Sequence, residues 1–137
     1  MTPEKLVTLA QEAMEKAYCP YSGYSVGAAL LCKDGTVYQG CNIENASFTP
    51  TICAERNAFF KAVYDGHREF TAIAVCGGKN GKITGQFPPC GVCRQVMREF
   101  VDDDFVLYLV GAEGSYEAVP FREILPHSFH PQTHMAD

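Results

Sequence analysis

The chain has 137 residues, an ordinary length for one domain and a short one for two. With 47% hydrophobic and 20% charged residues, it has the composition of a folded globular domain, which argues against a disordered, collagenous or coiled-coil protein. Its net charge of −5 disfavours long nucleic acids as partners, because binding a phosphate backbone needs a clustered basic surface. We therefore expect a single domain over residues 1–137.

The apolar stretches of the sequence are short. The longest, residues 26–31 and 105–110, are far below the roughly 20 residues that a membrane-spanning helix needs. The first residues show neither the basic start and apolar run of a secretory signal nor its cleavage site. We expect no membrane span and, by default, a cytoplasmic location.

The first half of the chain predicts a helix, a hairpin and a second helix. A Thr-Pro pair followed by apolar residues at helical spacing predicts a helix over residues 2–18. Residues 24–33 and 36–43 are rich in β-forming residues and flank an Asp-Gly turn, which indicates two antiparallel strands. A helix is expected over about residues 52–64, ended by a second Asp-Gly pair.

The second half predicts three more strands and one helix. A strand over residues 70–76 leads into residues 77–89, which hold four glycines and two prolines and are predicted to be a loop. A helix follows over residues 91–101, and then strands over 105–110 and 116–119. The link between these last two strands is shorter than the dozen or so residues of a parallel crossover, so they are expected to be antiparallel.

These elements predict an α/β domain with a mixed five-stranded sheet flanked by helices. The tail after Pro126, from about residue 127 on, has little apolar periodicity and contains three of the four histidines, His127, His130 and His134. We expect this tail to be mobile and its histidines to be solvated.

Cys90 and Cys93 form a Cys-x-x-Cys pair at the start of the third predicted helix. Side chains three residues apart lie on one helix face, and the free N–H groups of a helix N-terminus stabilise thiolates. The pair alone fits either a zinc site or a redox dithiol. A third ligand would distinguish the two.

Cys53, at the start of the second predicted helix, is the candidate for that ligand. Glu55 follows two residues later and therefore points elsewhere on the helix. Three protein ligands and an open fourth position are typical of catalytic zinc, with a nearby Glu that moves a proton. The alternative is a structural zinc site closed by a fourth ligand. Four more cysteines are expected to be buried thiols: Cys19, Cys32, Cys41 and Cys76.

Cys-Ala-Glu at residues 53–55, followed by Pro-Cys-Gly-Val-Cys at residues 89–93, resembles the motif of the zinc-dependent deaminases. The chain resembles more closely the small homotetrameric cytidine deaminases with three cysteine ligands, from about residue 3 to residue 129. The supporting segments are residues 21–30, 40–46, 53–56, 89–95 and 125–126. The resemblance implies a single cytidine deaminase domain of three layers, with one zinc ion per chain held by Cys53, Cys90 and Cys93.

The resemblance also implies the activity, which is hydrolytic deamination of cytidine and 2′-deoxycytidine to the uracil nucleosides and ammonia. Such a hydrolase serves pyrimidine salvage and acts on free nucleosides. Glu55 would protonate N3 of the ring and later the leaving amine. Arg56 and Arg94 each follow a ligand and would offset the charge of the thiolates, while ordinary salt bridges are the alternative.

Four residues match substrate-binding positions of the resembled family. Asn42 and Glu44 match the residues that bind the sugar hydroxyls, and the alternative is a pair of polar turn residues. Tyr24 falls where the family usually has a Phe beside the nucleoside, and the alternative is a core aromatic. Ala54, between Cys53 and Glu55, is the fourth.

Phe129 matches the aromatic residue that reaches into the active site of a neighbouring chain. The resemblance thus implies a homotetramer with shared active sites. An apolar aromatic in a polar tail favours this interpretation, because the ring has no obvious partner in its own domain. The alternative is that Phe129 folds back beside Leu125.

Three other functions compete with this hypothesis. A deaminase of the same fold could act on another aminopyrimidine, such as blasticidin S, but Asn42 and Glu44 favour a ribose. Polynucleotide-editing deaminases generally use a histidine ligand and a parallel final strand pair, neither of which is predicted here. A zinc-stabilised binding module would share the cysteines and lack turnover.

Overall fold

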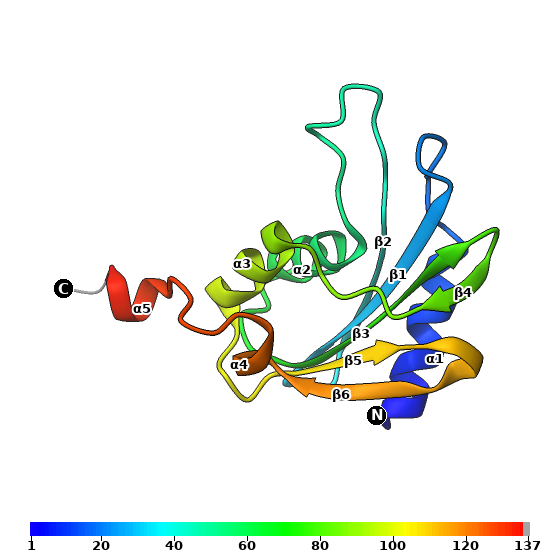
Figure 1. Cartoon of the computed structure of the whole chain (residues 1–137). Helices are drawn as coiled ribbons and strands as arrows, with labels where there is room; N and C mark the ends of the chain where they lie inside the picture. Colours follow the sequence, from blue (N-terminus) through cyan, green and yellow to red (C-terminus); the bar gives the residue numbers. More distant parts are fainter. Residues whose placement is uncertain (136–137) are drawn as a thin grey trace.

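The computed structural model describes residues 1–135 as a mixed six-stranded sheet between helices (Figure 1). The strand order is β2-β1-β3-β5-β6, and β4 pairs with β3 outside this path. Helix α1 covers one face of the sheet, while α2, α3 and α4 cover the other. The elements are α1 (Pro3–Met14), β1 (Tyr24–Cys32), β2 (Val37–Cys41), α2 (Ala54–Tyr64), β3 (Phe70–Lys79), β4 (Lys82–Gly85), α3 (Gly91–Phe100), β5 (Val106–Val110), η1 (Ala112–Gly114), β6 (Tyr116–Pro120), α4 (Phe121–Ile124) and α5 (Pro131–His134).

Strand β3 is the centre of the sheet. It pairs along its length with β1, antiparallel, and its other edge is shared by two strands. Residues 72–75 pair with β5, parallel, and residues 77–79 pair with β4, antiparallel. The last strands, β5 and β6, are antiparallel, which confirms the prediction from their short link.

Two hydrophobic clusters fill the space on either side of the sheet. Successive strand residues point to opposite faces, so Ala28 and Leu30 of β1 join the cluster under α2 and α3, while Ala29 joins the cluster under α1. In β3, Ile73 and Ala74 divide between the two clusters in the same way. The prediction of a three-layer α/β domain is therefore confirmed.

Two glycines allow the long helices to lie directly on the sheet. A Cβ atom at Gly27 would lie 2.1 Å from the carbonyl oxygen of Ala10 in α1, and one at Gly40 would lie 2.4 Å from that of Ala54 in α2. Neither distance leaves room for a methyl group. Because Ala54 is the first residue of α2, Gly40 determines how closely the N-terminus of this helix approaches β2.

The prediction of a loop over residues 77–89 was wrong in part, because β3 continues to Lys79 and β4 follows. The connection is the two-residue turn Asn80-Gly81, in which both residues have positive φ, 55° and 74°. This is the type I′ geometry of a tight hairpin. The sheet accordingly has six strands where five were predicted.

A small ladder of bridges explains two helix boundaries that differ from the prediction. The first helix ends at Met14, four residues early, because Tyr18 pairs with Ile43. The second begins at Ala54, because Ile52 is paired in turn with Ile43 in an antiparallel bridge. As a result Cys53 is the N-cap residue of α2.

The C-terminal tail that the sequence predicts to be mobile contains the single helical turn α5. Residues 136–137 of that tail lie outside the described residues. Within residues 1–135, no helix combines the length and the apolar character that crossing a membrane would require.

Candidate active site

The structure brings the three predicted ligand cysteines together at the N-termini of α2 and α3. Cys53 is the N-cap of α2, Cys90 is the N-cap of α3, and Cys93 lies three residues further along α3. Both helices point their N-termini, where the backbone N–H groups lack helical partners, at the same place. This is an electrostatic environment that stabilises thiolates.

The spacing of the sulfurs fits a zinc ion. The three Sγ atoms lie within 4.8 Å of one another, and those of Cys53 and Cys90 are 3.7 Å apart. Two sulfurs bound at about 2.3 Å to a tetrahedral zinc ion would be about 3.8 Å apart. The third sulfur, that of Cys53, is the ligand that a zinc site needs and a redox dithiol does not. Cys93 is buried and Cys90 is exposed, so the cluster is open on one side.

The thiols of the cluster ionise unequally. The pKa of Cys53 is lowered to about 5, because the Cys93 thiol donates a hydrogen bond to its sulfur and Arg56 and Cys90 add further contacts that outweigh its partial burial. The pKa of Cys93 is raised, first by its hydrogen bond to Cys53 and then by burial. The first negative charge of the cluster is therefore held on Cys53.

Glu55 is the buried acid of the site, with a residue exposure of only 4%. It is the second residue of α2, and its charge acts on the neighbouring thiol of Cys93. Burial, with a smaller contribution from the charge of Cys53, raises the pKa of the Glu55 carboxyl to about 7, against the opposing effects of a backbone hydrogen bond and of Arg56. The structure therefore places a carboxyl group beside the sulfurs and shields it from water.

The two predicted charge-compensating arginines have different surroundings. Arg56 donates a hydrogen bond from Nη2 to Sγ of Cys53 at 3.5 Å. Arg94 donates from Nε to the carbonyl of Pro89 and from Nη1 to that of Ile124, both at 2.7 Å. Within residues 1–135, the hydrogen bonds of Arg94 thus go to carbonyl oxygens, and its role toward the thiolates stays a prediction.

Asn42 and Glu44 organise the backbone of residues 21–26, at the start of β1. Asn42 is buried; its Nδ2 donates to the carbonyl of Tyr24 at 2.8 Å, and its Oδ1 accepts from the N–H of Val26 at 2.9 Å. Glu44 accepts from the N–H groups of Tyr21 and Ser22 at 2.9 and 3.0 Å.

The hydroxyl of Ser22 adds a third hydrogen bond to Glu44, at 2.5 Å. This bond, followed by those from the two N–H groups, lowers the pKa of the Glu44 carboxyl despite some desolvation. The carboxylate is therefore fixed in place. The Tyr21-Ser22 turn that fixes it was not predicted, because nothing in the sequence shows that a residue 22 positions away contacts it.

Tyr24 is 42% exposed and is therefore not a core aromatic. Its ring lies 5.9 Å from that of Phe87 and 5.4 Å from the Lys79 ammonium group. Neither neighbour was predicted, although an aromatic residue directly before Pro-Pro-Cys was a visible signal for Phe87. Ala54 has a fully buried methyl group and begins α2, so its backbone is the part that lies at the site.

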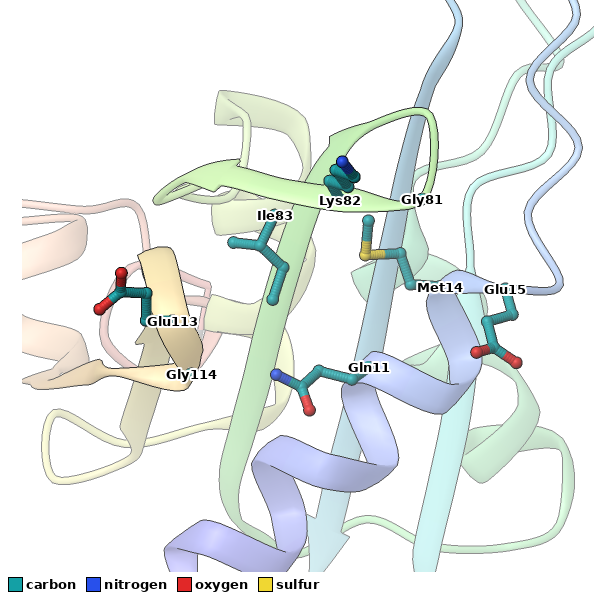
Figure 2. A pocket seen from close by; sticks show the side chains of 8 residues that line it. All are labelled: Gln11, Met14, Glu15, Gly81, Lys82, Ile83, Glu113 and Gly114. Carbon is teal, nitrogen blue, oxygen red and sulfur yellow. The ribbon is translucent and has the colours of Figure 1, made fainter.

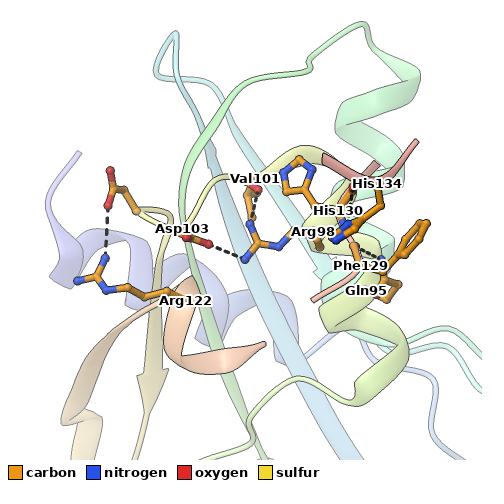
Figure 3. Close-up of polar contacts among 9 residues, drawn as sticks. Gln95, Arg98, Val101, Asp103, Arg122, Phe129, His130 and His134 are labelled. Carbon is orange, nitrogen blue, oxygen red and sulfur yellow. Dashed lines mark hydrogen bonds and ion pairs between the residues drawn. The ribbon is translucent and has the colours of Figure 1, made fainter. Parts of the chain in front are cut away.

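Phe129 does not pack into the core of its own chain. It is 54% exposed, and its ring stacks on that of His134 at 5.2 Å. Gln95 of α3 holds the segment by donating a hydrogen bond from Nε2 to the carbonyl of Phe129 at 3.0 Å (Figure 3). The aromatic ring is thus presented at the surface, on a segment tied to the helix that carries Cys90 and Cys93.

A cavity of about 380 Å³ lies elsewhere in the molecule, between α1, β4 and η1 (Figure 2). Its lining includes Gln11, Met14 and Ile83, and none of the three clustered cysteines. The chemistry described above therefore belongs to an open surface at the helix N-termini and not to this cavity.

Comparisons with known proteins agree with this geometry. The family described as "cytidine and deoxycytidylate deaminase zinc-binding region" matches residues 1–109. A cytidine deaminase of Sporosarcina psychrophila is 48% identical over 94% of this chain and 92% of its own length. One of Halalkalibacterium halodurans is 46% identical over 94% of this chain and 95% of its own. The crystal structure of cytidine deaminase from Burkholderia pseudomallei, 44% identical, superposes with a TM-score of 0.87 and covers 94% of this chain and all (100%) of that one.

Proposed function

Because this chain belongs to the cytidine and deoxycytidylate deaminase family, we propose that it hydrolyses cytidine and 2′-deoxycytidine to uridine and 2′-deoxyuridine, releasing ammonia, in pyrimidine salvage. One observation carries the proposal. Three sulfurs converge within 4.8 Å of one another at two helix N-termini, beside the buried carboxyl of Glu55.

Cys53, Cys90 and Cys93 are the residues that would hold zinc, one ion per chain. When bound there, zinc supplies a Lewis acid that makes a water molecule acidic near neutral pH. Glu55 takes up one proton of the attacking water and transfers it to N3 of the pyrimidine ring. It then takes the second proton from the hydroxyl now attached to C4 and transfers it to the amine, which leaves as ammonia. The overall reaction consumes one water molecule and releases one molecule of ammonia. Glu55 gives up every proton that it takes up, so it returns to its starting state.

Arg56 supports this chemistry from the side of the sulfurs. Three thiolates around a doubly charged cation leave a net charge of −1, which makes a bound water less acidic. The hydrogen bond from Arg56 to Cys53 draws charge away from one sulfur. We propose that Arg94, which lies on α3, also draws negative charge away from the sulfurs.

The nucleoside is proposed to lie between Tyr24 and the N-terminus of α2. Asn42 uses one of its two Nδ2 hydrogens for the carbonyl of Tyr24, and Glu44 uses three of about four acceptor positions. Each therefore retains one position for a sugar hydroxyl. Ala54 contributes a backbone N–H of the first helical turn, which has no partner within the helix.

We also propose a homotetramer in which Phe129 of one chain completes the active site of a neighbour. The exposed ring and the open side of the cysteine cluster support this, because a nucleoside base bound there needs an apolar cover. A cytoplasmic location is proposed from the seven free thiols, which suit a reducing compartment.

The experiment that tests the function is the loss of ultraviolet absorbance when cytidine is added to zinc-replete protein. Turnover is expected for the wild type, and Glu55→Gln should lower it by at least about a hundredfold while zinc content stays at one ion per chain. Glu99→Gln, which changes an exposed acid of α3, serves as the matched control. Wild-type protein that binds cytidine without converting it would make the chain a binding module and contradict the proposal.

A further inference from the structure

A second group of metal-binding side chains lies at the opposite end of α2 from Cys53. Donor atoms of Cys32, Asp34 and His67 all lie within 4.8 Å of one another. Cys32 ends β1, Asp34 lies in the turn to β2, and His67 follows α2. Since the eleven residues of α2 span about 16 Å, this group is separate from the cysteine cluster.

The backbone fixes the position of His67. Gly66 has φ +99°, the left-handed conformation that glycine adopts readily, and ends α2 in a Schellman motif. In this motif the N–H of Gly66 donates to the carbonyl of Val63 and that of His67 donates to Ala62, both at 3.0 Å. The chain is thereby turned back toward the sheet, and His67 is brought to the end of β1.

The hairpin between β1 and β2 fixes the other two residues. Cys32 donates from its N–H to the carbonyl of Thr36 at 2.8 Å and accepts from the N–H of Gly35 at 3.0 Å. Asp34 accepts from the N–H of Thr36 through Oδ1 at 3.0 Å, which leaves Oδ2 directed at His67. The distance from Oδ2 to Nδ1 of His67 is 3.7 Å.

The exposure of the three side chains increases from the core toward the solvent. Cys32 is buried, His67 is half-buried and Asp34 is exposed, so an ion can enter from the side of Asp34. The imidazole of His67 is oriented by an edge contact with the ring of Tyr38 at 5.4 Å. Lys33, the cation of the same hairpin, is paired with Glu69 at 3.6 Å.

We propose that Cys32, Asp34 and His67 form a second metal site, which binds a divalent transition ion of the zinc class. Thiolate, imidazole and carboxylate are the donors that such ions take in proteins, and water would fill the fourth position. One thiolate and one carboxylate neutralise a doubly charged ion, which suits a half-buried place. The bound ion would clamp the β1–β2 hairpin to the connection between α2 and β3. The site does not depend on the proposed catalytic function.

The test is cobalt(II) added to the zinc-replete protein, because a cobalt–thiolate bond gives a charge-transfer absorption band. The tail histidines can also bind cobalt, but this band needs a cysteine ligand, and no group of three or more donor atoms among the described residues joins a tail histidine to a cysteine. Two variants remove a ligand, Cys32→Ser and His67→Gln. Cys76→Ser is the matched control, since Cys76 is equally buried, and burial raises the pKa of both thiols to about 11.

The band is expected in the wild type and in Cys76→Ser. It should be lost, or require at least about tenfold more cobalt, in Cys32→Ser and His67→Gln. His67→Gln keeps the test decisive if the core substitution at Cys32 impairs folding, because His67 is half-buried and lies outside the helix. Absence of a band in the wild type overturns the site. So does a band that His67→Gln leaves unchanged, because that signal would come from exchange at the first cluster.

Discussion

The sulfur of Cys53 accepts a hydrogen bond from a guanidinium group. The Nη2 atom of Arg56 lies 3.5 Å from Sγ of Cys53 and 3.5 Å from the carbonyl oxygen of Thr51. The Nε atom of the same side chain is buried without a hydrogen-bond partner among the described residues. Among the described residues Arg56 makes no ion pair with a carboxylate, and its contact with the sulfur supports the proposed role of its charge.

Substitution of Arg56 is therefore expected to affect turnover more than metal content. Arg56→Gln should lower kcat for cytidine by between about ten- and a hundredfold, because the thiolates then keep more negative charge and oppose the ionisation of water. Zinc content, measured by elemental analysis, should stay near one ion per chain. Arg122→Gln, at a surface pair with Asp104, is the control. An unchanged kcat would assign Arg56 an ordinary structural role.

Single residues also show how far the sequence predicted the site. The convergence of Cys53 with Cys90 and Cys93 was predictable. A Cys-x-x-Cys pair at the start of one predicted helix needs a third ligand to form a catalytic zinc site, and Cys53 lies at the start of another predicted helix. The partners of Arg94 were not predictable. One of them is the carbonyl of Ile124, 30 residues further along the chain, and no local pattern indicates such a contact.

Among the elements, α2 matters most because Cys53 is its N-cap residue and Glu55 lies in its first turn. Its position depends on the bare backbone of Gly40, where a Cβ atom would lie 2.4 Å from the carbonyl oxygen of Ala54 and 2.6 Å from the backbone nitrogen of Ala58. A displacement of the helix here moves the cysteine that precedes it.

Gly40→Ala should therefore lower the free energy of unfolding by about 1–3 kcal/mol and also weaken zinc binding. Gly27→Ala is the matched control, since its Cβ would clash in the same way with α1, which carries no ligand. Denaturant unfolding and competition with a zinc chelator measure the two effects. Equal zinc affinities in the two variants would contradict the link between Gly40 and the metal site.

The helices and strands were predicted well where local sequence signals determine their bounds. They were predicted less well where pairing between distant segments determines those bounds. Strand β4 was missed although Asn80-Gly81 is a strong hairpin signal, because the glycines and prolines around it favoured a loop. The premature end of α1 was not predictable, because Tyr18 leaves the helix to pair with Ile43, a residue distant in sequence.

At the scale of the whole molecule, one hydrogen bond joins the first helix to the last strand. The hydroxyl of Tyr116 in β6 donates to Oε2 of Glu4 in α1 at 2.5 Å, across 112 positions of sequence. This bond, with smaller effects of desolvation and of the Glu4 charge, raises the pKa of Tyr116. A raised pKa in the folded state means that the protonated phenol contributes stability, and the contribution is present below the ordinary pKa of about 10.

The wild type should therefore be more stable than Tyr116→Phe at neutral pH, and this difference should shrink as the pH rises above about 10 and Tyr116 ionises. Denaturant midpoints at neutral pH and at about pH 11 measure the difference. Tyr64→Phe, which removes the hydroxyl of a highly exposed tyrosine, is the control. A difference that does not change with pH would mean that the hydroxyl packs without bonding to Glu4.

The proposed sharing of active sites is also a property of the whole assembly. Phe129→Ala should raise KM for cytidine with zinc retained, because the base loses its apolar cover. Mixed with inactive Glu55→Gln protein under conditions of subunit exchange, it should form some sites that carry both Glu55 and Phe129. Partial recovery of the wild-type KM is the expected result. A monomer by light scattering, or no recovery despite proven exchange, would contradict the shared site.

The bridge between Ile43 and Ile52 has one more consequence, which concerns the loop that rises between β2 and α2 in Figure 1. Each of the two residues donates its N–H to the carbonyl of the other at 3.0 Å, so the loop is closed at its base by backbone hydrogen bonds. An intact peptide chain at Phe48, an exposed residue of this loop, is therefore not needed to hold Cys53 in position. A protease that cuts the loop there would yield two fragments that stay associated through the sheet, with all three cysteine ligands on the second fragment.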